Sequence, residues 1–233
     1  MQKRCARGFT LIELLIVIAV IAILASIAYP VFIGVEEHAK ATKDMSNLRQ
    51  IGIATQLYMN DNDGALPGST TVSWMSQLNP KYDSAWGIFQ SPFDTRSPSE
   101  AGIAAPVSPI SYGINANIYP PPNNTAISAD KITKPTIFIL FAPAQASGTT
   151  VSFQGTALTA APGVTVLGIG PPPPPPPQAT SNPGGNATGG THSSRQKINA
   201  LFADLHLENM TWSVFANNAN VPSDPSAAQR WSP

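Results

Sequence analysis

A single carboxylate inside a long uncharged stretch constrains this chain more than any other feature. Glu13 follows Arg7-Gly8-Phe9-Thr10-Leu11-Ile12, and the residues from Leu14 to Val35 carry no charge. A stretch of this length and apolarity predicts a transmembrane helix. A carboxylate inside a membrane span costs about 2.5–3.5 kcal/mol, so such a residue is by default a functional hypothesis.

The charges on either side of the stretch predict its orientation. Lys3, Arg4 and Arg7 precede it, and the next lysine or arginine is Lys40. Because basic residues stay on the cytoplasmic side, we expect a cytoplasmic N-terminus and an exported remainder.

Residues Arg7 to Glu13 resemble the class III leader of type IV prepilins and type II secretion pseudopilins. In that family a prepilin peptidase cuts after the last glycine of the leader, and the new N-terminal phenylalanine is methylated. The resemblance implies cleavage between Gly8 and Phe9, N-methylation of Phe9, and Glu13 as the fifth residue of the mature chain. Pro30 falls where many members of the family carry a helix-kinking proline.

The resemblance also implies partners and a location. The partners are a prepilin peptidase, other pilin or pseudopilin subunits in a homo- or hetero-filament, and an inner-membrane assembly platform. The chain would cross the inner membrane once with a periplasmic head, or reach the cell surface if it is assembled into a pilus.

A physical argument supports an assembly role for Phe9 and Glu13. Cleavage would free an α-amine at Phe9, about one helical turn or 6 Å from Glu13. In an apolar bundle this amine could neutralise Glu13 of a neighbouring subunit or of its own. The pair would set the axial register, because a slip leaves a buried charge unpaired. We therefore predict Phe9, Glu13 and Pro30 as assembly residues.

Three other interpretations of the N-terminus compete with this one. Ser26-Ile27-Ala28 could be the cleavage site of a secretory signal peptide, although the apolar region of such peptides is roughly 7–15 residues long. The stretch could also be a plain single-pass anchor with Glu13 near the cytoplasmic interface. A lipoprotein is set aside, because Cys5 precedes the apolar stretch.

Composition limits the rest of the chain. With 233 residues, 13 basic and 13 acidic side chains and 11% charge, we expect one anchored chain with one modest domain. Removing the three basic residues of the leader leaves 10 basic against 13 acidic side chains, a net charge of −3, so no nucleic-acid partner is predicted. Cys5 is the sole cysteine and would leave with the leader, so the mature chain could form no internal disulfide.

The pattern predicts that the helix continues beyond the membrane, from about Thr10 to Asn60. An apolar stripe recurs at helical spacing, while Glu36/Lys40 and Lys40/Asp44 form i,i+4 pairs on other faces. Pro30 and Gly34 should bend or loosen this helix. The stripe consists of Met45, Leu48, Ile51, Thr55 and Tyr58.

These features predict an α+β, pilin-like fold in which a long N-terminal transmembrane spine helix packs on a small, mainly antiparallel β-sheet head. The expected parts are a leader at 1–8, a transmembrane and filament-core helix at 9–35, its amphipathic continuation at 36–60, and a head at 61–233 with a Pro/Gly-rich loop at 170–191.

The run Asn60-Asp61-Asn62-Asp63-Gly64 predicts the end of the helix and a turn. Asp61 and Asp63 are weak candidates for calcium ligands. The spacing departs from that of a calcium loop, and no bidentate glutamate follows at the required distance. A solvated turn is the favoured interpretation.

Further stretches resemble pilin-like proteins common in Planctomycetes-type bacteria: Asn47 to Tyr58, Asp61 to Pro67, Trp74 to Asp94, and Ser111 to Asn115. Relatives often carry Cys-Pro where this chain has Ser91-Pro92. Their C-terminal signature runs His, nine residues, Asp-Gly.

The match to that signature is imperfect. His192 and Asp204 are separated by eleven residues, and Leu205 stands in the place of the glycine. Since glycine is best suited to a tight turn with positive φ, we expect a wider turn here.

His192, Asp204, His206 and Glu208 could ligate a metal or form an acid–base pair. However, Asp204, His206 and Glu208 alternate with apolar residues, which is typical of the wet face of a half-buried strand. No Gly-rich phosphate loop, metal-spaced cysteine set or nucleophile elbow is present. We therefore predict neither an enzyme nor a cofactor.

The head reads as short strands broken by proline, with Ile137–Phe141 as a central strand or one packed under the helix. Pro171–Pro177 would form a stiff spacer of roughly 22 Å, either in an exposed loop or as a ligand for an aromatic groove. The tail Asn217–Pro233 should lie over the surface or be disordered. Further candidate strands are Val151–Leu158, Gly163–Ile169, Ile198–Ala203 and Leu205–Val214.

Together these features predict a structural subunit of a type IV pilus or a type II secretion pseudopilus. The alternative is a membrane-anchored extracytoplasmic binding module that does not polymerise. The sequence does not separate a major pilin, a minor pilin and a pseudopilin.

Overall fold

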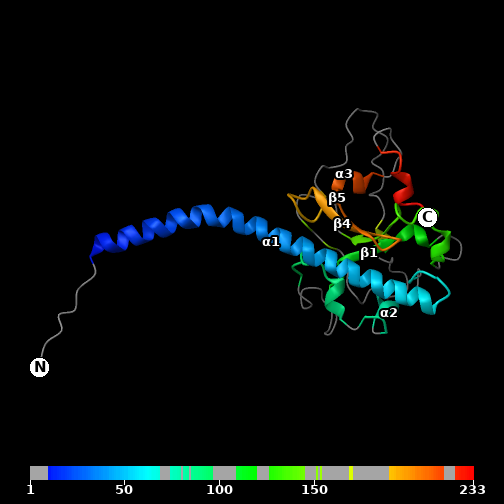
Figure 1. Ribbon diagram of the computed structural model, residues 1–233. Helices are drawn as coiled ribbons and strands as arrows, with labels where there is room; N and C mark the ends of the chain where they lie inside the picture. The colour runs from blue at the N-terminus through cyan, green and yellow to red at the C-terminus, as the bar shows by residue number, and fades with distance from the viewer. Residues whose placement is uncertain are drawn as a thin grey trace, which may run out of the picture. The chain divides into compact units, whose positions relative to one another are not determined.

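The computed structural model describes residues 10–68, 74–79, 81–83, 85–96, 109–119, 126–144, 151, 153, 168–169, 189–217 and 224–233. The chain divides into two compact units, Met1–Ala39 and Lys40–Pro233. Helix α1 (Leu11–Asp61) contributes to both of them (Figure 1).

The first unit contains the apolar part of α1. The helix starts at Leu11 and continues through Pro30, as predicted from the pattern. Its large apolar side chains are exposed; Leu11, Val17 and Ile27 for example are 82%, 48% and 66% exposed. An apolar surface all around a helix needs a lipid or protein environment.

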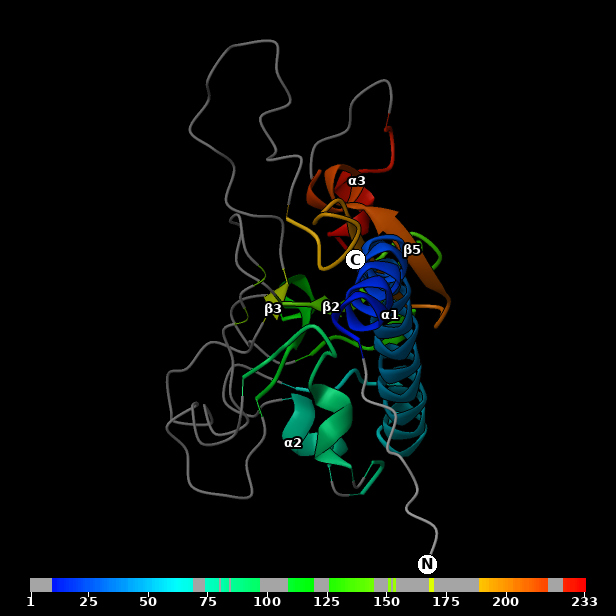
Figure 2. The same cartoon turned by 90° about the vertical axis from the view of Figure 1, so that its left-hand side faces the viewer.

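The second unit contains a sheet with the strand order β3-β1-β2-β4-β5. Figure 2 labels β3, β2 and β5 of this sheet. The pairs β1–β2, β2–β4 and β4–β5 are antiparallel, and only β3 pairs in parallel, with β1. The α+β fold with a mainly antiparallel sheet is therefore confirmed, and β2 is the central strand that was predicted from Ile137–Phe141. The strands are β1 (Tyr112–Asn115), β2 (Ile139–Pro143), β3 (Gly168–Ile169), β4 (Lys197–Phe202) and β5 (Leu207–Thr211).

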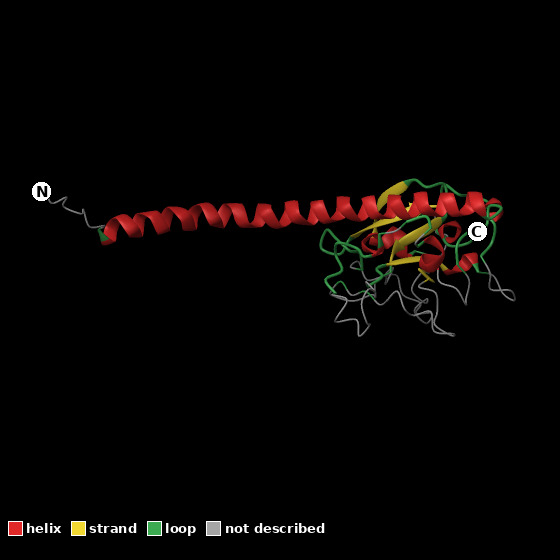
Figure 3. Cartoon of the chain, turned by 90° about the horizontal axis from the view of Figure 1, so that it is seen from below, coloured by secondary structure: helices red, strands yellow, loops and turns green. Residues whose placement is uncertain are grey.

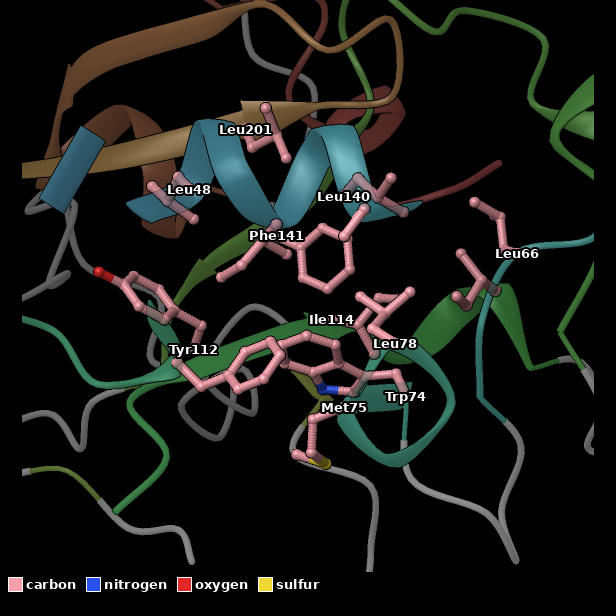
Figure 4. Close-up of a cluster of buried hydrophobic side chains, with 14 of the residues drawn as sticks. Leu48, Leu66, Trp74, Met75, Leu78, Tyr112, Ile114, Leu140, Phe141 and Leu201 are labelled. Carbon is pink, nitrogen blue, oxygen red and sulfur yellow. The ribbon is translucent and has the colours of Figure 1, made fainter. Parts of the chain in front are cut away.

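The main core lies between α1 and one face of the sheet, where Leu48 and Ile51 of α1 are fully buried (Figure 4). A β-bulge between Ile139 and Phe141 turns the side chains of both Leu140 and Phe141 toward this core. In a regular strand consecutive side chains point to opposite faces, so only one of the two could enter it. Trp74 of α2 (Trp74–Leu78) meets the ring of Phe141 edge-on at 4.8 Å between centroids.

A second core covers the opposite face of the sheet. Figure 3 shows the strands and short helices of this unit coloured by secondary structure. Helix α3 (Trp212–Ala216) starts directly after β5, so the prediction of a strand from Leu205 to Val214 is wrong at its end. The helical turn places the rings of Trp212 and Phe215 5.4 Å apart on one face, where both enter this core.

The C-terminal tail belongs to the second core. The prediction that it lies over the surface or is disordered is wrong for its last part, because Trp231 is 2% exposed and contacts Phe215 edge-on at 5.1 Å. The carbonyl oxygen of Trp231 accepts a hydrogen bond from Asn117 at 2.6 Å. Arg230 binds Asp224 through two hydrogen bonds of 2.6 and 2.7 Å.

The turn between β4 and β5 is wider than a two-residue hairpin loop, as expected, since Ala203 to His206 separate the two strands. Leu205 itself takes the left-handed conformation, with φ 70°, that glycine would adopt at lower cost. Its side chain lies against Gly52 of α1, where a Cβ would be 3.5 Å from a methyl group of Leu205. Packing on the helix therefore offsets the backbone strain.

The Pro171–Pro177 run lies outside the described residues, as does most of the predicted strand Val151–Leu158. The remaining elements within the described residues are four 3-10 helices: η1 (Trp86–Phe89), η2 (Ala116–Ile118), η3 (Ala129–Lys131) and η4 (Ala228–Arg230).

Candidate functional site

The amino end of α1 is closed by three reciprocal hydrogen bonds between Thr10 and Glu13. The hydroxyl of Thr10 accepts a hydrogen bond from the Glu13 amide at 3.4 Å. In return, Glu13 Oε2 accepts from the Thr10 amide at 2.9 Å and from the Thr10 hydroxyl at 2.8 Å. This arrangement is a capping box, in which two amide donors at a helix start are satisfied by side chains.

The capping box gives Glu13 a local role that the sequence analysis missed. The pattern Thr-x-x-Glu before an apolar run is a recognised signal for a helix start and could have been read from Thr10-Leu11-Ile12-Glu13. Both hydrogen bonds to the carboxylate use Oε2, and among the described residues no donor reaches Oε1.

Helix α1 is long and apolar enough to cross a membrane. Glu13 and Pro30 both lie on it, whereas Gly8 and Phe9 lie outside the described residues.

A second polar site joins the C-terminal half of α1 to the sheet. Asp44 is fully buried, and its carboxylate accepts hydrogen bonds from the hydroxyls of Ser91 at 2.5 Å and Tyr112 at 2.7 Å. Asn199 on β4 donates to the same carboxylate at 2.9 Å and to the carbonyl oxygen of Ala41 at 3.0 Å. Three segments distant in sequence thus meet on one turn of the helix.

Burial raises the pKa of Asp44, and the hydrogen bonds from Ser91, Tyr112 and Asn199 oppose this rise. The prediction that Asp44 lies on an outer helix face with Lys40 is wrong, since its side chain is inside the protein. The neighbouring Asn47 is also buried and donates to the carbonyl oxygen of Gln90 at 3.0 Å. The sequence correctly predicted that Leu48 and Ile51 belong to the stripe that packs on the head. It did not predict that the polar residues Asp44 and Asn47 are buried as well.

Comparisons with known proteins match the amino end of this chain. Residues 3–29 match the family model of the prokaryotic N-terminal methylation motif. The N-terminal segment is therefore similar to that of pilin-like proteins with a class III leader.

Curated relatives of this chain come from two systems. The type IV major pilin protein PilA of Myxococcus xanthus is 34% identical over 76 residues, which are 33% of this chain and 34% of the relative. The type II secretion system core protein G of Aeromonas hydrophila is 40% identical over 63 residues, 27% of this chain and 44% of the relative. The type IV wide pilus major component PilA4 of Thermus thermophilus is 43% identical over 60 residues, 26% of this chain and 46% of the relative.

The chain thus spans between a third and a half of the length of these relatives. No solved structure matches it.

The end of α1 forms the predicted turn. The Gly64 amide donates to the Met59 carbonyl oxygen at 2.9 Å, and Asp63 takes a left-handed conformation with φ 53°, as in a Schellman cap. Asp61 accepts from Lys81 at 2.9 Å and from the hydroxyl of Tyr82 at 3.0 Å. A calcium role for Asp61 and Asp63 stays a weak hypothesis, since within the described ranges no cluster of three metal-ligating side chains occurs.

The four candidate residues near the C-terminal signature do not form one site. His206 binds Asp204 in the exposed β4–β5 turn, and Glu208 is exposed on β5. His192 is 5% exposed and instead contacts Thr191, Asn209 and the ring of Phe93.

Proposed function

We propose that this chain is a structural pilin-like subunit, cleaved between Gly8 and Phe9 by a prepilin peptidase, methylated at Phe9, and assembled through α1 into a type IV pilus or a type II secretion pseudopilus. The observation that carries the proposal is the methylation motif at residues 3–29, which leads into an exposed apolar helix capped by Glu13. The role is structural, and the other partners would be further subunits and an inner-membrane assembly platform.

The capping box explains how Glu13 could serve two purposes. Its Oε2 closes the helix of its own chain through Thr10, so the side chain is held at a defined rotamer before assembly. Oε1 would then accept the Phe9 amine of a neighbouring subunit. A carboxylate that stays unpaired in the membrane costs about 2.5–3.5 kcal/mol, so the pair would favour the assembled state in one register.

The domain boundaries follow from the same proposal. Residues 1–8 would be the leader, 9–35 the membrane and filament-core segment, 36–60 its continuation, and 61–233 the head. The membrane segment would keep the N-terminus in the cytoplasm and place the head in the periplasm or on the filament surface.

Filament assembly tests the role of Glu13. Glu13→Gln and Glu13→Ala should insert into the membrane and be cleaved, yet the fraction of processed subunit in sheared filaments should fall sharply. Glu36→Gln is the matched control, because Glu36 lies just beyond the apolar stretch. Thr10→Val separates the helix cap from the proposed pairing with the Phe9 amine, because this variant loses the hydroxyl of the cap and keeps the Glu13 carboxylate.

Processing is tested by intact mass. The mature chain should begin at Phe9 with one added methyl group, and Gly8→Val should leave the precursor uncut. A mature N-terminus at Tyr29 would establish the signal-peptide interpretation. Normal filament yield from both Glu13 variants would refute the register mechanism, and monomers alone in detergent would favour the binding module.

A further inference from the structure

Asp44 is a buried titratable group that the proposed assembly does not use. It is fully buried on α1, and the described side chains that donate hydrogen bonds to its carboxylate are uncharged. They belong to Ser91, Tyr112 and Asn199. A buried carboxylate costs free energy unless it is paired with a cation or neutralised by a proton. The hydrogen bonds of this cluster show where such a proton can reside.

Asn199 excludes one of the two carboxylate oxygens of Asp44. Its amino group donates to the carbonyl oxygen of Ala41 at 3.0 Å, and a carbonyl oxygen can only accept. The same amino group donates to Asp44 Oδ2 at 2.9 Å, while the oxygen of Asn199 accepts from Asn209 at 2.6 Å. The amide orientation is therefore fixed, and Oδ2 of Asp44 is an acceptor in either protonation state.

The other carboxylate oxygen, Oδ1, faces two hydroxyl groups. It accepts from the hydroxyl of Ser91 at 2.5 Å and from that of Tyr112 at 2.7 Å. Because a hydroxyl can donate or accept, either of them can turn to accept a hydrogen bond from a protonated Oδ1. The cluster can thus hold a neutral Asp44 without losing a hydrogen bond to Oδ1.

Asn47 supplies an acceptor that the neutral form of Asp44 can satisfy. Asn47 is 2% exposed and donates to the Gln90 carbonyl oxygen at 3.0 Å, but among the described residues no donor reaches its own side-chain oxygen. Both hydroxyls donate to Oδ1 while Asp44 is charged, and a proton on Oδ1 frees one hydroxyl hydrogen. Since Asn47 interacts with the hydroxyl of Tyr112, the freed hydrogen has an acceptor beside it. A buried acceptor without a donor is destabilising, so this arrangement favours the neutral form.

We propose that Asp44 is a buried proton-binding site, neutral in the folded head at pH values where an exposed aspartate is charged, which couples the packing of the sheet on α1 to the uptake of one proton. The proton comes from the solvent and resides on Oδ1, between Ser91 and Tyr112. Burial raises the pKa of Asp44 above its value in the unfolded chain. The stability that this proton contributes is therefore fully present in acid, below the unfolded pKa, and is lost as the pH rises through the raised pKa.

Other charged groups on the same elements bear on this sign. On the segment that contains Ser91, Arg96 is bound to Asp94 at 2.6 Å, so this pair carries no net charge. Lys40 lies one helical turn before Asp44 on α1, and a cation close to the carboxylate would favour the charged form. Lys40 is therefore included in the test. Two further cations on the packed elements are exposed: Lys43 on α1 and Lys197 on β4.

Denaturant unfolding of the full chain in detergent, from about pH 4.5 to about pH 8, tests the site. The unfolding constant of the wild type relative to that of Asp44→Asn should rise with pH by up to tenfold per pH unit, because one proton is involved. Asparagine is the neutral isostere of a protonated aspartate, and its amino group would take the place of the protonated Oδ1. Asp44→Asn should therefore match the wild type at the acidic end of the range and be more stable at the alkaline end.

Two variants serve as controls. Asp94→Asn removes a carboxylate that Arg96 neutralises, so it should destabilise the head at neutral pH and leave the dependence on Asp44 in place. Lys40→Met should also retain this dependence. A dependence that appeared only in Lys40→Met would overturn the proposal, because Lys40 would then be the counter-charge of Asp44 in the wild type.

Infrared difference spectroscopy of the wild type keeps the proposal testable if Asp44→Asn fails to fold. At mildly acidic pH the folded chain should show the carbonyl stretch of a protonated carboxyl group, and this band should disappear on unfolding at the same pH. Absence of the band, or a stability ratio between the wild type and Asp44→Asn that does not rise with pH, would overturn the proposal. Neither measurement involves cleavage or filament formation, so their outcome is independent of the proposed function.

Discussion

Truncation of Trp231 tests whether the C-terminal tail stabilises the head. The indole is 2% exposed, contacts Phe215 at 5.1 Å, and donates from Nε1 to the Asn217 carbonyl oxygen at 3.3 Å. Replacing a buried aromatic side chain by alanine typically costs about 3–5 kcal/mol. For a domain of this size each kcal/mol lowers Tm by about 2–4 °C, so Trp231→Ala should lower it by roughly 6–20 °C.

The measurement is the thermal unfolding of the full chain in detergent, followed by near-ultraviolet circular dichroism. Deletion of the exposed Ser232 and Pro233 is the control and should change the free energy of unfolding by less than about 0.5 kcal/mol. Trp231→Phe should give an intermediate Tm. If Trp231→Ala melted within about 2 °C of the wild type, the tail would be a surface segment and the second core would end at Phe215.

Two further predictions concern the loops below α1 and the sheet. Gly68→Ala should lower the free energy of unfolding by about 1–3 kcal/mol in denaturant titrations, because φ is 100° at Gly68 and the new Cβ would overlap the hydroxyl of Tyr119. Gly87→Ala is the control and should not lower it, because the space around Gly87 is open. Burial raises the pKa of Asp94, but the hydrogen bonds from Arg96 and Ser111 outweigh this effect and hold the pKa of Asp94 below its usual range. The Asp94 carboxylate therefore contributes to stability above about pH 4, and this contribution is lost as the pH falls through the lowered pKa. Thermal unfolding at a series of pH values should show a smaller loss of stability in Arg96→Met than in the wild type.

Local patterns in the sequence determined the features that depend on neighbouring residues. The uncharged stretch after Glu13 and the apolar stripe beyond it predicted a helix from about Thr10, and the Asn/Asp/Gly run predicted its end at about Asn60. The observed α1 spans Leu11–Asp61. The apolar run before Pro143 predicted the central strand, and the candidate strand Ile198–Ala203 corresponds to β4. Helical and strand periodicity and turn propensity act within a few residues, which is why these elements could be read without a fold.

The tertiary structure decided the placement of every side chain whose partners are distant in sequence. Asp44 has the spacing of an ordinary surface i,i+4 partner, and only the arrival of Ser91, Tyr112 and Asn199 shows that it is buried. The polar tail gave no local sign that Trp231 would enter a core. His192 likewise meets the Asn209 side chain, 17 residues further along the chain, only in the folded head. Long-range burial and hydrogen bonding depend on which segments the fold brings together, and that information lies in the packing of the whole head.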